Sequence, residues 1–162
     1  MKNISEWNVD HLVITGDLTD NASEKDFDLL RRALKKFGFL AGERLSIVIG
    51  NHDIFGGVQK AEDIFAFPDK ISSINYSKQV SNFISYFPEA YENCYHLSQN
   101  EFFPFVKRIK NVLLIGLNSV AEYSKLSNPF GSNGEINASQ FGETCELLKS
   151  VDEDIKYRIG MH

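Results

Sequence analysis

The chain has 162 residues, a formal net charge of -5 and a hydrophobic fraction of 43%, values that suit one globular domain with a sizeable core. The acidic balance argues against non-specific nucleic-acid binding, which requires a basic face. No apolar run approaches the roughly 20 residues that span a bilayer, and no apolar signal segment is visible near the start, so a cytoplasmic protein without a transmembrane segment is expected.

Two strands joined by a helix are predicted in the first third of the chain. Residues 9–15 contain the apolar run Leu-Val-Ile and residues 45–49 contain a second run, and continuous runs of this kind favour strands that are buried on both faces. Between them Ser23 begins a helix, with Asp26 as its capping partner, and Gly38 ends it. A strand, a helix and a strand at this distance indicate a parallel pair. The residues after such strands lie at one edge of the sheet, where α/β sheets bind ligands.

The middle of the chain, residues 54–93, is interpreted as a cap or insertion over the strand ends. Its periodicity is weak. Short helices are expected around 60–65 and 78–87, with Pro68 and Pro88 as breakers. The many aromatic side chains of this segment favour packing against the domain over the wall of a pocket.

The second half of the chain is expected to add further strands and one helix. Strands are predicted over residues 94–97, 102–106, 112–117 and 155–159, and a helix over residues 137–151. Pro104 lies within the second of these strands and indicates an edge position, because proline cannot donate to a strand ladder. No repeat and no clean linker is found, so residues 1–162 are expected to form one α/β domain.

Three polar residues of different types each follow a predicted strand: Asp17, Asn51 and His162. A carboxylate, an amide oxygen and an imidazole form a mixed oxygen and nitrogen ligand set, which suits Mn, Fe, Co, Zn or Ni better than Ca or a thiolate-seeking ion. A carboxylate can bridge two such ions about 3.5–4 Å apart, and a paired site of this kind activates water and binds a phosphoryl group.

Two further residues directly follow Asn51. His52 would lie beside the metals and donate to a leaving oxygen or a phosphate oxygen, and Asp53 would orient its imidazole and raise its pKa. His11 and His96 lie in strands without a partner motif and are expected to be structural.

Several motifs of the chain resemble those of the calcineurin-like metallophosphoesterases. Residues 16–20, Gly-Asp-Leu-Thr-Asp, and 50–53, Gly-Asn-His-Asp, resemble the second and third signature blocks of that family. Residues 114–119 resemble the strand that many members carry next, 134–136 and Gln140 the start of the following helix, and 160–162 the start of the fourth block. The resemblance implies a layered β-sheet sandwich flanked by helices.

The resemblance also implies a role for each candidate residue. Asp17 matches the metal-bridging aspartate, Asn51 and His162 match ligands of a metal ion, His52 matches the catalytic histidine, and Asp53 matches the acid that supports it. A neighbouring position, Asp20, matches one that usually supports the loop rather than the metal.

Two blocks of the family pattern are not found. No Asp-x-His block precedes Asp17, and the Gly-His-x-His block would lie beyond His162. We therefore expect a partial domain from a truncated gene product, whose intact parent binds two divalent ions. The first ion would lack most of its ligands, and the second would keep Asp17, Asn51 and His162, so the chain would hold one ion or none.

The resemblance implies a metallophosphoesterase that hydrolyses a small phosphodiester or phosphomonoester through a metal-activated water at a dinuclear site. Residues 16–20 are similar to the cyclic-nucleotide phosphodiesterase-like branch, which favours a phosphodiester. The alternative is a catalytically inactive fragment or scaffold of the same fold, and an unrelated binding module is the third interpretation. The oligomeric state is left open.

Overall fold

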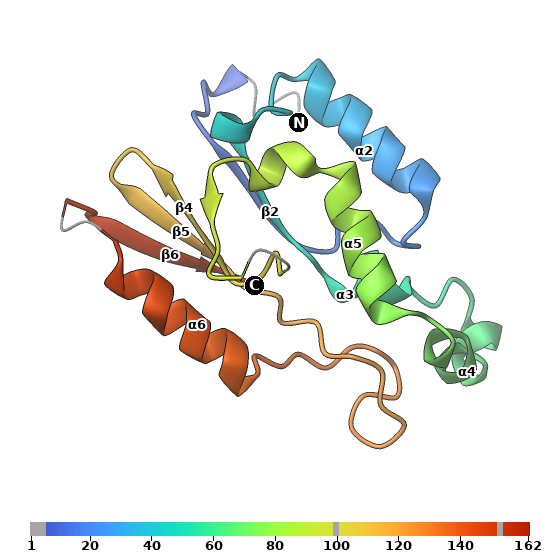
Figure 1. The fold of residues 1–162 in the computed structure, drawn as a ribbon. Helices are drawn as coiled ribbons and strands as arrows, with labels where there is room; N and C mark the ends of the chain where they lie inside the picture. Colours follow the sequence, from blue (N-terminus) through green and yellow to red (C-terminus); the bar gives the residue numbers. More distant parts are fainter. Residues whose placement is uncertain (1–5, 99–100, 152–153) are drawn as a thin grey trace.

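The computed structural model describes residues 6–98, 101–151 and 154–162, and the strands it describes form two sheets (Figure 1). In the first sheet β1 (Leu12–Thr15) runs parallel to β2 (Leu45–Val48). The connection between them is α2 (Glu24–Lys36). The predicted parallel strand–helix–strand unit is thereby confirmed.

The sequence of α2 explains its bounds. The side chain of Ser23 accepts a hydrogen bond from the backbone N–H of Asp26 at 3.2 Å and donates to its carboxylate at 2.7 Å, which fixes the first turn. Phe27 and Leu34 lie on one face and are completely buried, so the helix packs on the core through the predicted apolar stripe.

The two strands of this sheet are buried to different extents. All four residues of β2 are buried, as predicted, whereas Val13 in β1 is 37% exposed. The prediction that residues 9–15 are buried on both faces is therefore wrong. Leu12 and Ile14 pack against the core, while the side chains between them point away from it, because successive residues of a strand face opposite ways.

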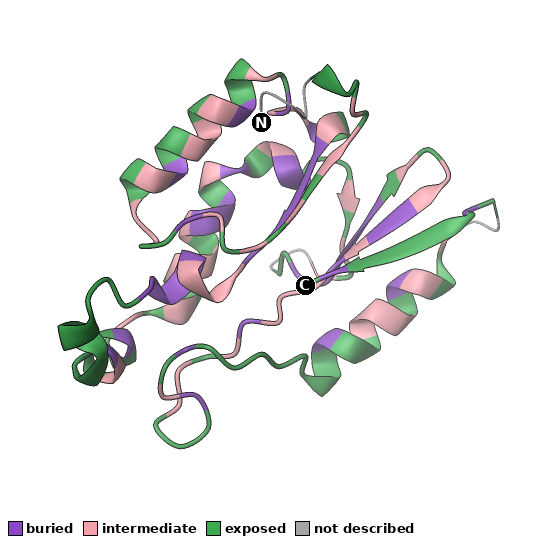
Figure 2. Ribbon diagram, turned by 180° about the vertical axis from the view of Figure 1, so that it is seen from behind, coloured by how far each residue is buried: buried purple, intermediate pink, exposed green. Residues whose placement is uncertain are grey.

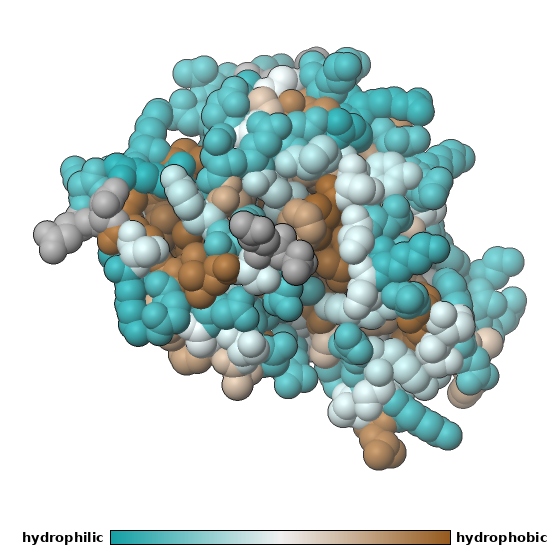
Figure 3. All heavy atoms as spheres, in the orientation of Figure 1, coloured by the Kyte–Doolittle hydropathy of each residue, from teal (hydrophilic) through white to brown (hydrophobic). Residues whose placement is uncertain are grey.

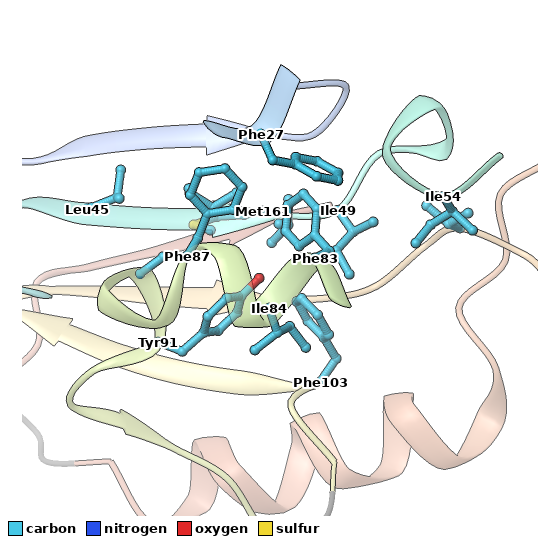
Figure 4. Packing of buried hydrophobic residues seen from close by; sticks show 14 of the residues in the cluster. Phe27, Leu45, Ile49, Ile54, Phe83, Ile84, Phe87, Tyr91, Phe103 and Met161 are labelled. Carbon is cyan, nitrogen blue, oxygen red and sulfur yellow. The ribbon is translucent and has the colours of Figure 1, made fainter. Parts of the chain in front are cut away.

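Residues 54–93 consist of short helices, as predicted. In chain order with the helix that precedes them, these are α3 (Asn51–Phe55), η2 (Ala61–Phe65), α4 (Phe67–Ser72), α5 (Tyr76–Tyr86) and η3 (Pro88–Tyr91). Phe83 and Phe87 are fully buried beside Phe27 of α2, with ring centroids 5.7 and 6.0 Å from that ring (Figure 4). This segment therefore contributes aromatic side chains to the main core.

The second sheet has the order β3-β4-β5-β6. Its strands are β3 (Cys94–Tyr95), β4 (Phe105–Ile109), β5 (Val112–Gly116) and β6 (Tyr157–Met161), and only the β5–β6 pair is parallel. The prediction of an edge strand over 102–106 is wrong. β4 begins after Pro104 and lies between two partners, since the proline without an N–H is outside the ladder.

The strands β4 and β5 of the second sheet are covered on both faces. Phe105 and Leu114 face the main core, which also receives β2, α2 and α5, whereas Val106 and Leu113 pack with Leu147 of α6 (Ala138–Lys149). Figure 1 shows α6 on the outer side of this sheet, and Figure 2 shows β6 exposed along most of its length. This arrangement is the expected α/β fold with layered sheets flanked by helices.

The face of the molecule shown in Figure 3 is mainly hydrophilic, as expected when most apolar side chains lie between the layers. Some apolar side chains are visible between the hydrophilic ones. None of the helices in the described ranges has the length and apolar character of a membrane-spanning segment.

A buried lysine joins the two sheets. Lys107 of β4 is 1% exposed, and its Nζ donates to the backbone oxygens of Leu45 in β2 and Ala90 in η3, both at 2.9 Å. Burial lowers the pKa of Lys107, because the interior disfavours its charged form. The two hydrogen bonds offset part of that cost and satisfy two carbonyl groups at the sheet interface.

We predict that Lys107→Ala lowers the free energy of unfolding by about 2–4 kcal/mol, since two buried carbonyl oxygens lose their donor and the side chain leaves a cavity. Urea denaturation followed by circular dichroism measures the change. Lys78→Ala, at an exposed position of α5, is the matched control and should leave the midpoint nearly unchanged. Equal effects of the two substitutions would contradict the bridging role.

Candidate functional site

All three predicted ligands line one cavity. The cavity has a volume of about 190 Å³, and Asp17, Asn51 and His162 are all in its wall, together with Gly50 and Ser119. These residues follow β1, β2, β5 and β6, so the two sheets converge on this point. In Figure 1 the C-terminal residue accordingly lies at the ends of β5 and β6.

Close contact between two glycines lets the loops after β1 and β2 meet. Gly16 has a φ of +95°, which favours glycine, and a Cβ on it would lie 2.7 Å from the backbone N of Gly50. A Cβ on Gly50 would lie 2.1 Å from the backbone N of Asp17 and 2.2 Å from its Oδ1. No side chain fits at either position, and the carboxylate of Asp17 therefore lies directly against the start of α3.

The backbone of Asp17 is itself unusual. Its φ of 49° places a non-glycine residue in the left-handed region, which costs free energy and is concentrated at functional sites. The backbone N–H of His52 donates to Asp17 Oδ1 at 3.0 Å. This bond holds the carboxylate beside the start of α3, where Asn51 lies.

Asp53 joins the two loops and does not contact the imidazole. Its Oδ1 accepts from the backbone N–H and the hydroxyl of Thr19 at 2.9 and 3.1 Å, and its Oδ2 accepts from the backbone N–H of Gly50 at 3.0 Å. The expected contact with His52 is therefore wrong, because both oxygens are used by the backbone frame. Burial raises the pKa of Asp53 despite these hydrogen bonds.

The partner of His52 is Asp20 instead. His52 Nδ1 lies 3.2 Å from Asp20 Oδ1, and Gln59 Nε2 donates to Asp20 Oδ2 at 2.9 Å. The hydrogen bond from Gln59 lowers the pKa of Asp20, and His52 acts in the same direction, so the carboxylate stays ionised near neutral pH. The family resemblance implied only a loop-supporting role for Asp20. Its place in the loop after β1, three residues after Asp17, was the sequence signal that could have indicated a contact with the loop after β2.

The loop beside His162 is supported by a hydrogen-bond network that was not predicted from the sequence. The side chain of Gln140 accepts from the backbone N–H of Asn118 at 2.8 Å and donates to its backbone oxygen at 2.9 Å. Asn118 Nδ2 donates to the Tyr76 hydroxyl at 2.9 Å. The adjacent Ser119 Oγ lies 3.5 Å from His162 Nδ1, so this network fixes the loop beside His162.

The other histidines lie in different surroundings. His11 Nδ1 is 2.8 Å from the backbone oxygen of Glu43, and its Nε2 is 2.9 Å from Ser46 Oγ. The ring of His96 packs near those of Phe102 and Phe105, with centroid distances of 6.2 Å. Neither histidine lines the 190 Å³ cavity, in keeping with the structural roles expected for them.

The donor set fits one divalent ion of intermediate hardness. One carboxylate, one amide oxygen and one imidazole line a single cavity, and the Asp17 carboxylate is held there by a backbone N–H. Within the described residues there is no group of three or more His, Cys, Asp and Glu side chains that could hold an ion. An ion bound at this cavity would therefore need the amide oxygen of Asn51 as a third donor.

The cavity brings a carboxylate, an amide and an imidazole together, and the His52–Asp20 pair belongs to the two loops that supply the first two of them. Residues 1–145 match the family model of the calcineurin-like phosphoesterases, so the chain belongs to this family of metal-dependent hydrolases that act on phosphate esters. The match includes both strand-end motifs of the first sheet, whereas His162, which lines the cavity, lies outside it. No curated protein and no solved structure matches the chain.

We predict that Gly50→Ala destabilises the protein and displaces the Asp17 carboxylate, because the added Cβ would overlap the Asp17 backbone and side chain. The matched control is Gly142→Ala in α6, where a Cβ has nothing within 4 Å. That control should raise the free energy of unfolding by about 0.5–1 kcal/mol, since alanine is the better helix former. Thermal denaturation measures both variants, and the melting temperature should fall in Gly50→Ala and rise in Gly142→Ala.

We further predict that Asp53→Asn lowers the free energy of unfolding by about 1–3 kcal/mol, because an amide cannot accept from Gly50 and Thr19 with both terminal atoms. Urea denaturation gives the change. Amide hydrogen exchange at Thr19 and Gly50 should accelerate in the same variant. Asp28→Asn, on the exposed side of α2, is the control, and unchanged exchange at Thr19 and Gly50 in Asp53→Asn would refute the assignment.

Proposed function

We propose that this site hydrolyses a small phosphate ester, with a phosphodiester as the first choice. The observation that carries the proposal is the convergence of Asp17, Asn51 and His162 on one cavity of about 190 Å³. His52 is not among the described residues of its wall, but it follows Asn51 directly and its backbone N–H donates to Asp17 Oδ1. Such a volume suits a metal ion and a phosphoryl group.

We further propose that Asp17, Asn51 and His162 hold a divalent ion, with Mn, Fe, Zn, Co and Ni as the candidates from the donor types. When bound, the ion supplies an activated water and neutralises charge on the phosphoryl group. Asp17 has a second carboxylate oxygen, so a dinuclear site with Asp17 as the bridging ligand is part of the proposal.

His52 is proposed to act as the general acid of the reaction. Its Nδ1 faces the ionised carboxylate of Asp20, so the proton on Nδ1 is held there and the opposite ring nitrogen is left to serve the substrate. A protonated ring would donate from Nε2 to the leaving oxygen, and Asp20 would stabilise the resulting positive charge. Asp20 is therefore a positioning residue. Asp53 acts indirectly, because its hydrogen bonds to Thr19 and Gly50 hold together the loops that carry Asp20 and His52.

A second candidate is a catalytically inactive member of the family that uses the same fold as a scaffold. It is favoured by one observation, which is that the described residues bring together a ligand set for one ion and no larger His, Cys, Asp and Glu group. The two candidates differ in whether metal-dependent turnover occurs at all.

We predict that the chain hydrolyses bis(p-nitrophenyl) phosphate in the presence of Mn²⁺, and that His52→Ala lowers kcat at least about 100-fold through loss of the proton donor. Asn51→Ala should weaken Mn²⁺ binding, which calorimetry measures separately from turnover. Asp20→Asn should shift the pH profile as well as kcat, as expected for a residue that acts through His52.

The control for these variants is Asn82→Ala in α5, which lies outside the cavity and should retain both turnover and Mn²⁺ binding. Absence of turnover with retained Mn²⁺ binding would favour the scaffold. Turnover that is unaffected by Asn51→Ala and His52→Ala would place the chemistry elsewhere.

A further inference from the structure

The segment that follows α3, residues 56–59, turns back to the loop that carries Asp20. Gly56 ends α3 with a φ of +67°, and its backbone N–H donates to the backbone oxygen of His52 at 3.0 Å. The backbone N–H of Gly57 then donates to the backbone oxygen of Asp20 at 2.7 Å. The segment therefore joins α3 to the loop after β1 by a contact that is separate from the one made by Asp53.

Gly57 lies directly against the imidazole of His52. A Cβ on Gly57 would lie 2.8 Å from Cε1 and 3.0 Å from Nδ1 of His52, and 3.0 Å from Oδ1 of Asp20. Because these distances are shorter than ordinary contacts of a Cβ, only a glycine lets the chain pass so close to the ring. The edge of the ring that carries Nδ1 therefore faces Asp20 and Gly57.

Gln59 holds the other oxygen of the Asp20 carboxylate. Its Nε2 donates to Asp20 Oδ2 at 2.9 Å, whereas His52 Nδ1 lies 3.2 Å from Asp20 Oδ1. The two oxygens thus have different partners, and this sets the rotation of the carboxylate about its last bond. The oxygen that receives the proton of Nδ1 is thereby kept in the direction of the ring.

The His52–Asp20 pair is too exposed to hold this geometry by itself. The side chains of His52 and Asp20 are 37% and 65% exposed. An exposed pair gains little from its own attraction, because water screens the charges and both side chains lose rotational freedom. A group that transfers a proton must nevertheless be held near one orientation, since a small displacement lowers the rate strongly. The restraint has to come from neighbouring contacts, and Gly57 and Gln59 make such contacts.

We propose that Gly57 and Gln59 are positioning residues of this site, which hold the His52 ring with Nδ1 toward Asp20 and leave Nε2 for the phosphate ester. The role of Nε2 rests on the proposed function, whereas the orientation of the ring rests on the hydrogen bonds and the close contact. Neither residue is among the described residues that line the 190 Å³ cavity, so their substitution should leave Mn²⁺ binding unchanged.

The first test measures the state of the ring without metal or turnover. Long-range ¹H–¹⁵N NMR spectra of the histidine-labelled chain are recorded at one alkaline pH, where the imidazoles are neutral, and His52→Gln assigns the signals. We expect the proton of His52 on Nδ1 in the unsubstituted chain. Gln59→Leu removes the donor to Asp20, and Gly57→Ala pushes a methyl group against the ring without requiring a left-handed backbone. Both should move the two ring nitrogen signals of His52 toward those of a tautomer mixture.

The second test measures whether this orientation serves proton transfer. Methyl phenyl phosphate and methyl p-nitrophenyl phosphate are compared with Mn²⁺ present, because phenolate is the more basic leaving group and depends more on a proton donor. Gln59→Leu should lower kcat about threefold to tenfold for the phenyl ester and about twofold or less for the p-nitrophenyl ester, with KM nearly unchanged. Gly57→Ala should act in the same direction. Gln59→Arg, which keeps a donor to Asp20, should restore kcat to within about twofold.

The controls are matched by residue type. Gln79→Leu in α5 and Gly142→Ala in α6 lie outside residues 56–59 and the small cavity, and they should change neither the ring signals of His52 nor the ratio of the two rates. Gln59 is exposed, so Gln59→Leu tests the role of the segment in a folded chain even where Gly57→Ala unfolds it.

The outcomes separate the positioning role from the proposed function. No hydrolysis of either ester by the unsubstituted chain, with His52 ring signals that respond to Gln59→Leu, would refute the proposed function and support the positioning of the ring. Unchanged ring signals of His52 in Gln59→Leu, or equal losses of kcat for the two esters, would overturn the positioning role alone.

Discussion

The carboxylate of Asp53 is the constraint on which the site depends. It is buried at the start of α3 and accepts hydrogen bonds from the loop after β1, through Thr19, and from the end of β2, through Gly50. A buried carboxylate is costly unless its oxygens are satisfied. Because its partners belong to two loops, satisfying it requires those loops to meet, and their contact places Asp17 beside Asn51.

The same geometry explains why glycines flank the site. Gly16 and Gly50 allow two backbones to approach more closely than any side chain permits, and Asp17 adopts a left-handed conformation between them. The remaining structure supports this arrangement. Lys107 links the second sheet to β2 and η3, and Gln140 fixes the loop that reaches His162. The third of the proposed ligands, His162, thereby comes from a different sheet than Asp17 and Asn51.

The chemistry of the small cavity follows from this convergence. It carries a carboxylate, an amide and an imidazole, the donor types that the proposed metal site requires. Each of the three directly follows a strand or lies within three residues of its end, so the frame of the two sheets sets their positions.

The local features could be predicted from the amino-acid sequence: the capped helix α2, the parallel pair β1–β2, and the candidate ligands that follow apolar strands. These features depend on neighbours in the chain, such as Ser23 and Asp26, and on a glycine before each motif. The contacts between side chains, in contrast, could be read only from the folded chain. It paired His52 with Asp20 and turned Asp53 to the backbone, moved β4 past Pro104, left β1 half-exposed, and brought His162 to Asp17. Adjacency in sequence does not fix side-chain direction, and burial depends on which elements pack on a face, so these contacts between distant segments required the folded chain.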